Sequence, residues 1–282
     1  MKITIKLAVY YFLYQLAFLI VFSVSYVVGY IIGGIEANKD FGNGSGYTFD
    51  IETFMDGSMY AITALSMIVA GIAMIWHLIH FKYVKFNLKS FCEVPAKTIL
   101  LSIPLIFAGM IFLNLCCEFL NVPDMMQDTF VHMSNSVLGV IAIVIMAPLV
   151  EELLFRGAIE GHFLRKGTKP VYAILISAAV FGIIHMNPGQ MLFGFLIGLI
   201  FGWLYYRTGS VVPGIIGHFI NNGLSCITMA TSTPEELNTK TIELWGATTT
   251  YIVFALSLVV FVALFIYMKN KLPEAPEYKL ED

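Results

Sequence analysis

Charged residues are scarce in this sequence. They make up 12% of its 282 residues, whereas 58% of the residues are hydrophobic. A soluble domain carries about a quarter of charged residues, and it cannot bury so much apolar surface because much of any small globule is surface. The composition therefore excludes an ordinary soluble domain and indicates a single membrane domain over residues 1–282.

Cysteine and net charge are also low. The chain has four cysteines, no Cys-x-x-Cys pair, and an adjacent pair, Cys116 and Cys117, within an apolar run. Such cysteines are typical of buried small hydrophobic residues, so neither a disulfide framework nor a zinc knuckle is supported. A net charge of −3 gives no reason to expect a nucleic-acid partner.

Long apolar runs fill most of the chain and predict an all-α, polytopic membrane protein with about eight transmembrane helices. The expected helices are Lys6–Gly34, Met59–Phe81, Thr98–Cys117, Val137–Gly161, Val171–Met186, Met191–Tyr206, Val211–Ala230 and Thr248–Met268. The first run is too long for a signal peptide and is expected to remain as a helix.

Lysine and arginine are distributed unevenly between the loops. With the N-terminus inside, 13 of the 16 basic residues lie in inner loops, two lie in outer loops, and Arg156 lies within a helix. Basic residues concentrate on the cytoplasmic side of membrane proteins. We therefore expect a multi-pass protein of the cell membrane with both termini in the cytoplasm.

The fourth expected helix carries charged residues, among them Glu151, Glu152 and Arg156, where the bilayer makes charge costly. Such residues usually mark a functional site. Glu152 and Arg156 are four residues apart, so they share a helix face and can form an ion pair. Glu151 is turned about 100° away from that face. One carboxylate can therefore be neutralised while the other, Glu151, stays free to act as a general base. A purely structural Glu–Arg pair is the alternative.

Two further helices bring polar groups into apolar surroundings. His185 closes the fifth helix, while His218 and Asn222 lie four residues apart on one face of the seventh. Their distances along the helices from the inner loops place them within about one turn of the depth of Glu151. A single membrane histidine is often only a hydrogen-bonded packing residue, but polar groups on three helices at one depth indicate a common site.

Three ordered motifs carry a family resemblance: Glu-Glu-x-x-x-Arg at 151–156, Phe-x-x-x-His at 181–185 and His-x-x-x-Asn at 218–222. With the glycines at 194, 198 and 202, they resemble the CAAX protease and bacteriocin-processing (CPBP, or Abi) family, which includes the type II CAAX prenyl endopeptidases. The resemblance covers residues 137–230, the expected catalytic core.

The resemblance implies an intramembrane protease whose catalytic residues are Glu151, His185, His218 and Asn222, with Glu152 and Arg156 in support. Glu151 and His185 would activate a water molecule. His218 and Asn222 would stabilise the oxyanion.

The family is often described as metalloproteases, in which zinc would be held by Glu151, His185 and His218. Carboxylate and imidazole are suitable zinc ligands. However, the sequence has no His-Glu-x-x-His motif, so a metal-free glutamate mechanism remains an equal alternative.

The expected partners are the lipid bilayer and a peptide or membrane-anchored protein substrate, such as a leader-bearing secreted peptide or a lipid-modified tail. Two other functions stay open: a non-catalytic membrane scaffold or bacteriocin self-immunity protein of the same fold, and a transporter with a proton relay. A transporter would be favoured by an inverted repeat, which the sequence does not display.

Overall fold

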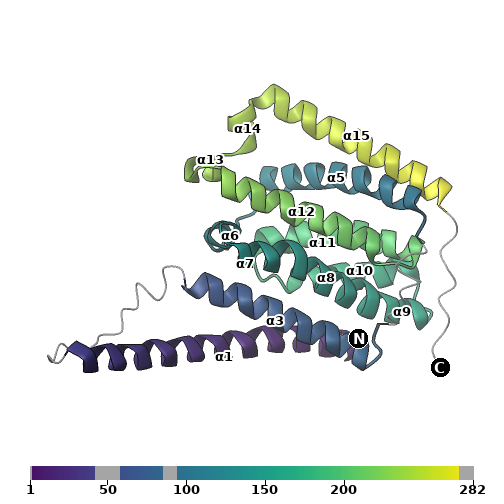
Figure 1. The fold of residues 1–282 in the computed structure, drawn as a ribbon. Coiled ribbons are helices and arrows are strands. Elements are labelled where there is room, and N and C mark those ends of the chain that lie inside the picture. The colour runs from purple at the N-terminus through teal and green to yellow at the C-terminus, as the bar shows by residue number, and fades with distance from the viewer. Residues whose placement is uncertain (1, 42–57, 85–93, 273–282) are drawn as a thin grey trace.

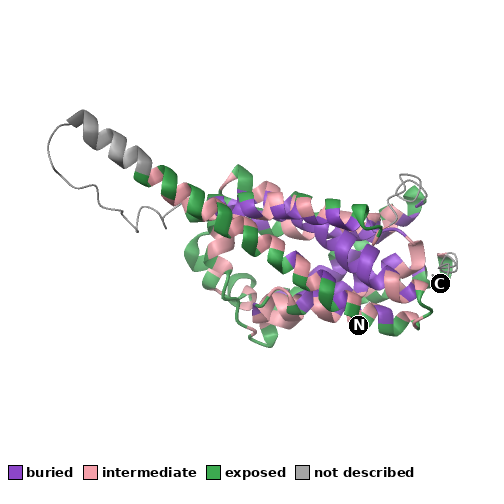
Figure 2. Cartoon of the chain, turned by 90° about the horizontal axis from the view of Figure 1, so that it is seen from below, coloured by how far each residue is buried: buried purple, intermediate pink, exposed green. Residues whose placement is uncertain are grey.

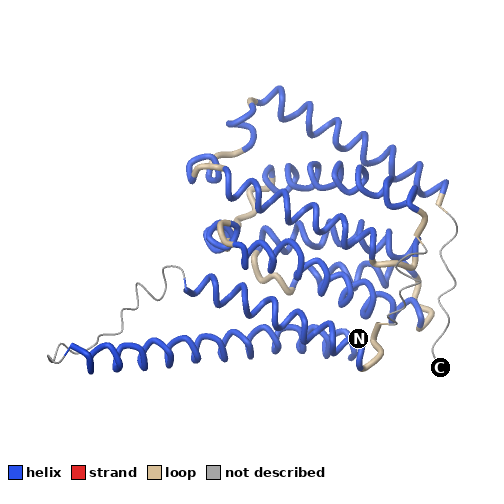
Figure 3. Tube along the Cα trace, viewed as in Figure 1, coloured by secondary structure: helices blue, strands red, loops and turns tan. Residues whose placement is uncertain are grey.

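The computed structural model describes residues 2–41, 58–84 and 94–272, and every regular element in that part of the chain is a helix (Figures 1 and 3). The long helices are α1 (Lys2–Phe41), α3 (Met59–His80), α5 (Ala96–Phe119), α10 (Pro170–Ile183), α11 (Pro188–Thr208), α12 (Val212–Thr231) and α15 (Ala247–Lys271). Short helices are α6 (Gln127–Ser134), α13 (Pro234–Asn238) and α14 (Thr241–Trp245). The all-α fold class is confirmed.

The fourth long helix, residues 137–165, is continuous but changes its pitch. It consists of α7 (Val137–Val140), the π-helix η2 (Ile141–Met146), α8 (Ala147–Glu152), the π-helix η3 (Leu153–Glu160) and α9 (Gly161–Arg165). Each of the eight expected segments thus falls on a helix.

Six of the described helices are long and apolar enough to cross a membrane, which supports the polytopic membrane assignment. The count of eight is not confirmed. The 14 residues of α10 extend only about 21 Å, less than the roughly 30 Å of a hydrocarbon core. Helix α12 has the length, but it carries His218 and two asparagines in its middle.

The helices form a bundle with two edges (Figure 1). Helices α1 and α3 pack together at one edge, α5 and α15 pack together at the other, and the fourth long helix lies between them with α10, α11 and α12. Buried residues make up 61% of the most apolar window of residues 137–165, against 6% in α1 and 11% in α15. The fourth long helix is therefore the interior of the bundle, and Figure 2 shows the buried residues gathered there. The edge helices α1 and α15 have mostly exposed outer faces, as expected of surfaces that contact lipid.

The first turn of α1 and the last turn of α15 lie at the same end of the bundle (Figure 1). Arg165 at the end of α9 donates to the carbonyl of Tyr83 after α3, and Arg207 at the end of α11 donates to the carbonyl of Lys269 near the end of α15. Basic side chains therefore gather at this end. Its assignment to the cytoplasmic side remains a prediction from the charge distribution.

Candidate active site

The two π-helices η2 and η3 flank the pair of glutamates on α8, one before and one after it along the chain. Pro148 lies at the start of α8, where its ring would clash with a carbonyl one turn earlier in a regular α-helix. The wider turns of η2 directly precede it, and π-helical turns of this kind often accompany functional sites. The local sequence thus places Glu151 and Glu152 on a single α-helical turn between two irregular segments.

Side chains of neighbouring helices bond to carbonyls of both π-helices. Asn222 on α12 donates its amide to the carbonyl of Ile143 in η2, at 2.8 Å. Ser177 on α10 donates its hydroxyl to the carbonyl of Phe155 in η3, also at 2.8 Å. Buried backbone acceptors need such partners, so these bonds fix α12 and α10 against the fourth long helix.

The ion pair expected from the spacing of Glu152 and Arg156 is present. Arg156 Nη1 lies 2.8 Å from Glu152 Oε1, and both side chains are fully buried. The guanidinium also donates to the carbonyl of Gly198 on α11 and lies 4.4 Å and 5.3 Å from the ring centres of Phe181 and Phe201. Arg156 therefore joins the fourth long helix to α10 and α11.

His218 on α12 lies between the two carboxylates. Its Nδ1 is 3.2 Å from Glu152 Oε1, and its Nε2 is 3.7 Å from Glu151 Oε2. The ring stacks on Phe201 and meets the edge of Phe181, so its plane is fixed by packing. A carboxylate on one ring nitrogen orients the imidazole and determines what the other nitrogen can do. The structure thus assembles Glu151, Glu152, Arg156 and His218.

His185 lies next to this cluster rather than within it. Helix α10 ends at Ile183, three residues before the expected end at Met186, so His185 follows the helix instead of closing it. Its Nδ1 is 2.8 Å from the carbonyl of Phe181, and its ring meets the edge of Phe181. Phe181 therefore contacts both histidines, His185 and His218.

Hydrogen bonds of a buried asparagine hold the turn that carries His185. Met186 has a positive φ of 48°, a conformation that is unfavourable for a non-glycine residue. The next residue, Asn187, is fully buried. Asn187 donates to Asp124 Oδ1 at 2.7 Å and accepts from the backbone amide of Met125 at 3.0 Å. These bonds attach the turn to the loop between α5 and α6.

Asn222 shares the face of His218 as expected, but its amide group is already engaged. Besides donating to Ile143, its Oδ1 accepts from the side chain of Asn221 at 3.0 Å. The expected role of Asn222 in oxyanion stabilisation stays a prediction.

Two residues of this region were not expected from the sequence. Tyr11 on α1 donates its hydroxyl to Glu151 Oε1 at 3.1 Å, in a buried position. Glu160 is fully buried, one turn beyond Arg156, and neither of its oxygens has a hydrogen-bond partner among the described residues. The spacing of Glu152, Arg156 and Glu160 by four could have indicated Glu160. No signal in the sequence indicated Tyr11.

The predicted zinc ligands do not form one cluster in this arrangement. Among the residues that the structure describes, no group of three or more His, Cys, Asp or Glu side chains could hold a metal ion. Glu151 and His218 are neighbours, but His185 is bonded to its own helix end. This donor set does not fit zinc, and the chemistry below uses the protein's own groups. Zinc binding stays an expectation from the family resemblance that this structure does not test.

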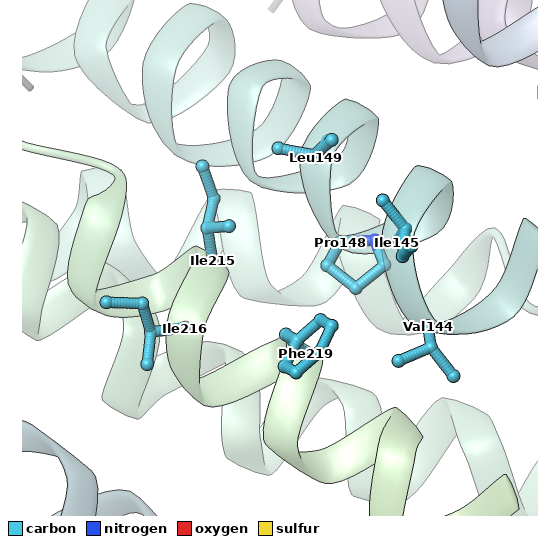
Figure 4. Close-up of a pocket in the computed structure, with 7 residues that line it drawn as sticks. All are labelled: Val144, Ile145, Pro148, Leu149, Ile215, Ile216 and Phe219. Atoms are coloured by element: carbon cyan, nitrogen blue, oxygen red, sulfur yellow. The ribbon is translucent and has the colours of Figure 1, made fainter. Parts of the chain in front are cut away.

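An apolar groove lies beside the cluster, between the fourth long helix and α12 (Figure 4). It contains about 420 Å³ of empty space, part of which is open to the surroundings. Its lining residues are Val144, Ile145, Pro148, Leu149, Ile215, Ile216 and Phe219. Pro148 precedes Glu151 by three residues and Phe219 directly follows His218, so the groove is within about one helical turn of the site.

Comparison with known families identifies the segment that contains these residues. Residues 133–224 match the model of the family described as "Rce1-like: Type II CAAX prenyl endopeptidase Rce1-like". The resemblance to type II CAAX prenyl endopeptidases is confirmed for this segment. The Rce1-like segment runs from α6 into α12 and contains all six predicted site residues, but not Tyr11.

Two curated proteins of Bacillus subtilis (strain 168) are similar to the chain. "Putative membrane peptidase YdiL" is 36% identical over 78 residues, which are 28% of this chain and 32% of that protein. "Uncharacterized protein YyaK" is 31% identical over 122 residues, which are 39% of this chain and 40% of that protein. The chain thus spans between about a third and two fifths of the length of these relatives. No solved structure shows significant similarity to the chain.

Proposed function

We propose that this chain is an intramembrane endopeptidase of the glutamate type. The main support for this function is a buried cluster enclosed by apolar helices, which consists of Glu151, His218, Glu152 and Arg156. Charged groups inside a membrane protein are costly and mark functional sites. The Rce1-like segment around the cluster and the similarity to YdiL support peptide-bond hydrolysis as the reaction.

In the proposed reaction, Glu151 is the general base. Its carboxylate takes a proton from a water molecule, whose oxygen attacks the carbonyl carbon of the scissile peptide. His218 donates from Nε2 to the oxyanion that forms. The carbon–nitrogen bond then breaks, and the proton on Glu151 passes to the leaving amine.

The other residues position these two groups. Glu152 holds Nδ1 of His218, so that Nε2 faces Glu151. Arg156 neutralises Glu152 and leaves Glu151 without a cationic partner from its own helix. His185 keeps its expected role in water activation, and Asn222 keeps its expected role in oxyanion stabilisation. Both roles require the side chain to turn toward the bound substrate.

The substrate class follows from the surroundings of the site. The groove between the fourth long helix and α12, within about one helical turn of Glu151 and His218, is lined by aliphatic and aromatic side chains. Such a lining suits an apolar segment near the scissile bond. We therefore propose membrane-associated peptides or protein tails as substrates, including leader-bearing peptides and lipid-modified C-termini.

The test is cleavage of a panel of membrane-tethered and leader-bearing peptides by the purified protein, analysed by mass spectrometry. The key variant is Glu151→Gln, which keeps the size of the side chain and removes the base. Glu160→Gln is the matched control, since Glu160 is also a buried glutamate of the same long helix but is not part of the cluster. We expect Glu151→Gln to lose cleavage by at least about 100-fold and Glu160→Gln to retain it.

Two results would contradict this function. Cleavage that persists in Glu151→Gln would exclude the proposed base. Absence of cleavage for every peptide, combined with a cellular phenotype that Glu151→Gln still supports, would instead favour the scaffold or immunity function.

A further inference from the structure

The first transmembrane helix contacts the candidate active site although it lies outside the Rce1-like segment. In the part of α1 whose side chains are described, residues 2–31, three are buried: Thr4, Leu7 and Tyr11. Their spacing of three and four places them on one helix face. The buried face of α1 therefore lies in its first three turns, and Tyr11 is the last buried residue of that face.

The Tyr11 hydroxyl reaches the carboxylate of Glu151 directly. It donates to Oε1 at 3.1 Å, while Oε2, the other oxygen of Glu151, lies 3.7 Å from His218 Nε2. The two oxygens thus face different partners. The terminal torsion of a glutamate side chain is broad, so a bond to one oxygen restricts the direction of the other.

We propose that Tyr11 is a positioning residue for Glu151, so that α1 completes the active site. The proposal rests on the function assigned to Glu151 above. Tyr11 fixes Oε1 and leaves Oε2 as the oxygen that faces His218 and takes the proton of the attacking water. A hydrogen bond to an ionised carboxylate is among the stronger ones in proteins, which suits it to hold this geometry.

A second tyrosine on the same helix provides the matched control. Tyr14 lies about one turn further along α1, and its hydroxyl is 3.1 Å from Nδ1 of His77 on α3. Both tyrosines therefore bond to a side chain of the bundle, but only Tyr11 contacts a residue of the cluster. Tyr11→Phe and Tyr14→Phe each remove one hydroxyl and keep the ring.

The first test compares the kinetics of the two full-length variants on a cleaved peptide. We expect Tyr11→Phe to lower kcat by about 10- to 100-fold, the scale of a small misplacement of a catalytic group, with an unchanged KM. Tyr14→Phe is expected to keep the kcat of the native protein. An unchanged kcat in Tyr11→Phe, or equal losses in both variants, would overturn the proposal.

The second test needs no substrate and separates this proposal from the proposed function. It is a double-mutant cycle of Tyr11→Phe and Glu151→Gln on the thermal unfolding temperature in detergent. We expect the two shifts in unfolding temperature to be non-additive, because both substitutions change the same hydrogen bond, from the Tyr11 hydroxyl to Glu151 Oε1. Additive shifts would overturn the contact, whether or not any peptide is cleaved.

Discussion

The stability of the bundle should depend on Glu152 far more than on Glu160, although both carboxylates are fully buried on the same long helix. Glu152 accepts from Arg156 at 2.8 Å and is 3.2 Å from His218 Nδ1. Glu160 has no hydrogen-bond partner for either oxygen among the described residues. The substitutions Glu152→Gln and Glu160→Gln are therefore a matched pair that differs in partners and not in burial.

The magnitude follows from what each substitution removes. Leaving one member of a buried ion pair without its partner costs about 3–5 kcal/mol. Because the glutamine at 152 keeps one oxygen that can accept from Arg156, we expect a loss near the lower limit, about 3 kcal/mol. At about 2–4 °C per kcal/mol for a chain of this size, the unfolding temperature should fall by roughly 6–12 °C. Glu160→Gln loses no bond and should stay within about 1 kcal/mol of the native protein.

The assay is thermal unfolding of both purified variants in the same detergent, followed by circular dichroism at a helical wavelength. Glu152→Gln should also lose most of its kcat, since His218 loses the group that orients it. Equal unfolding temperatures for the two variants would refute the reasoning. A lower temperature for Glu160→Gln than for Glu152→Gln would show that Arg156 depends mainly on Glu160.

Three further predictions concern the packing around the site, the turn of His185 and the metal. A Cβ at Gly214 would lie 2.6 Å from Glu152 Oε2, whereas one at Gly223 would meet only a methyl group at 3.6 Å; Gly214→Ala should therefore lower kcat by at least about 10-fold, while Gly223→Ala on the same helix should not. Asn187→Ala removes two hydrogen bonds of a buried side chain. It should destabilise the protein by about 1–3 kcal/mol and lower kcat through His185, whereas Asn238→Ala, at an exposed position, should change neither unfolding temperature nor rate. Because Glu151, His185 and His218 do not form one ligand cluster, we expect cleavage to resist chelators and the purified protein to contain well below one zinc ion per chain. One zinc ion per chain, with activity that is lost on chelation and restored by zinc, would contradict this prediction.

The sequence determined the class of the protein. Long apolar runs with few charges can be satisfied only by helices in a bilayer, because the backbone must form its hydrogen bonds internally. Because such apolar runs form helices, the eight expected segments could be located from the sequence, and all of them fall on helices. The number of crossings could not be settled, since α10 is too short and α12 too polar to be judged by length and composition.

The sequence also indicated the residues of the site, but not all of their contacts. Motif spacing fixed the pair of Glu152 and Arg156, since a separation of four within one helix determines the distance. Contacts between helices have no such rule. The position of His218 between Glu151 and Glu152, and the engagement of Asn222 by the backbone of η2, depend on how α12 packs against the fourth long helix.

The tertiary structure alone decided which distant segments complete the site. Tyr11 is 140 residues from Glu151 in sequence, on a helix without a motif, and reaches it because α1 packs beside the fourth long helix. Asp124 similarly holds the turn of His185 from a loop more than 60 residues away. Local sequence fixes helices and the spacing within them, whereas the burial of apolar faces selects which helices become neighbours. That selection brought Tyr11 to Glu151.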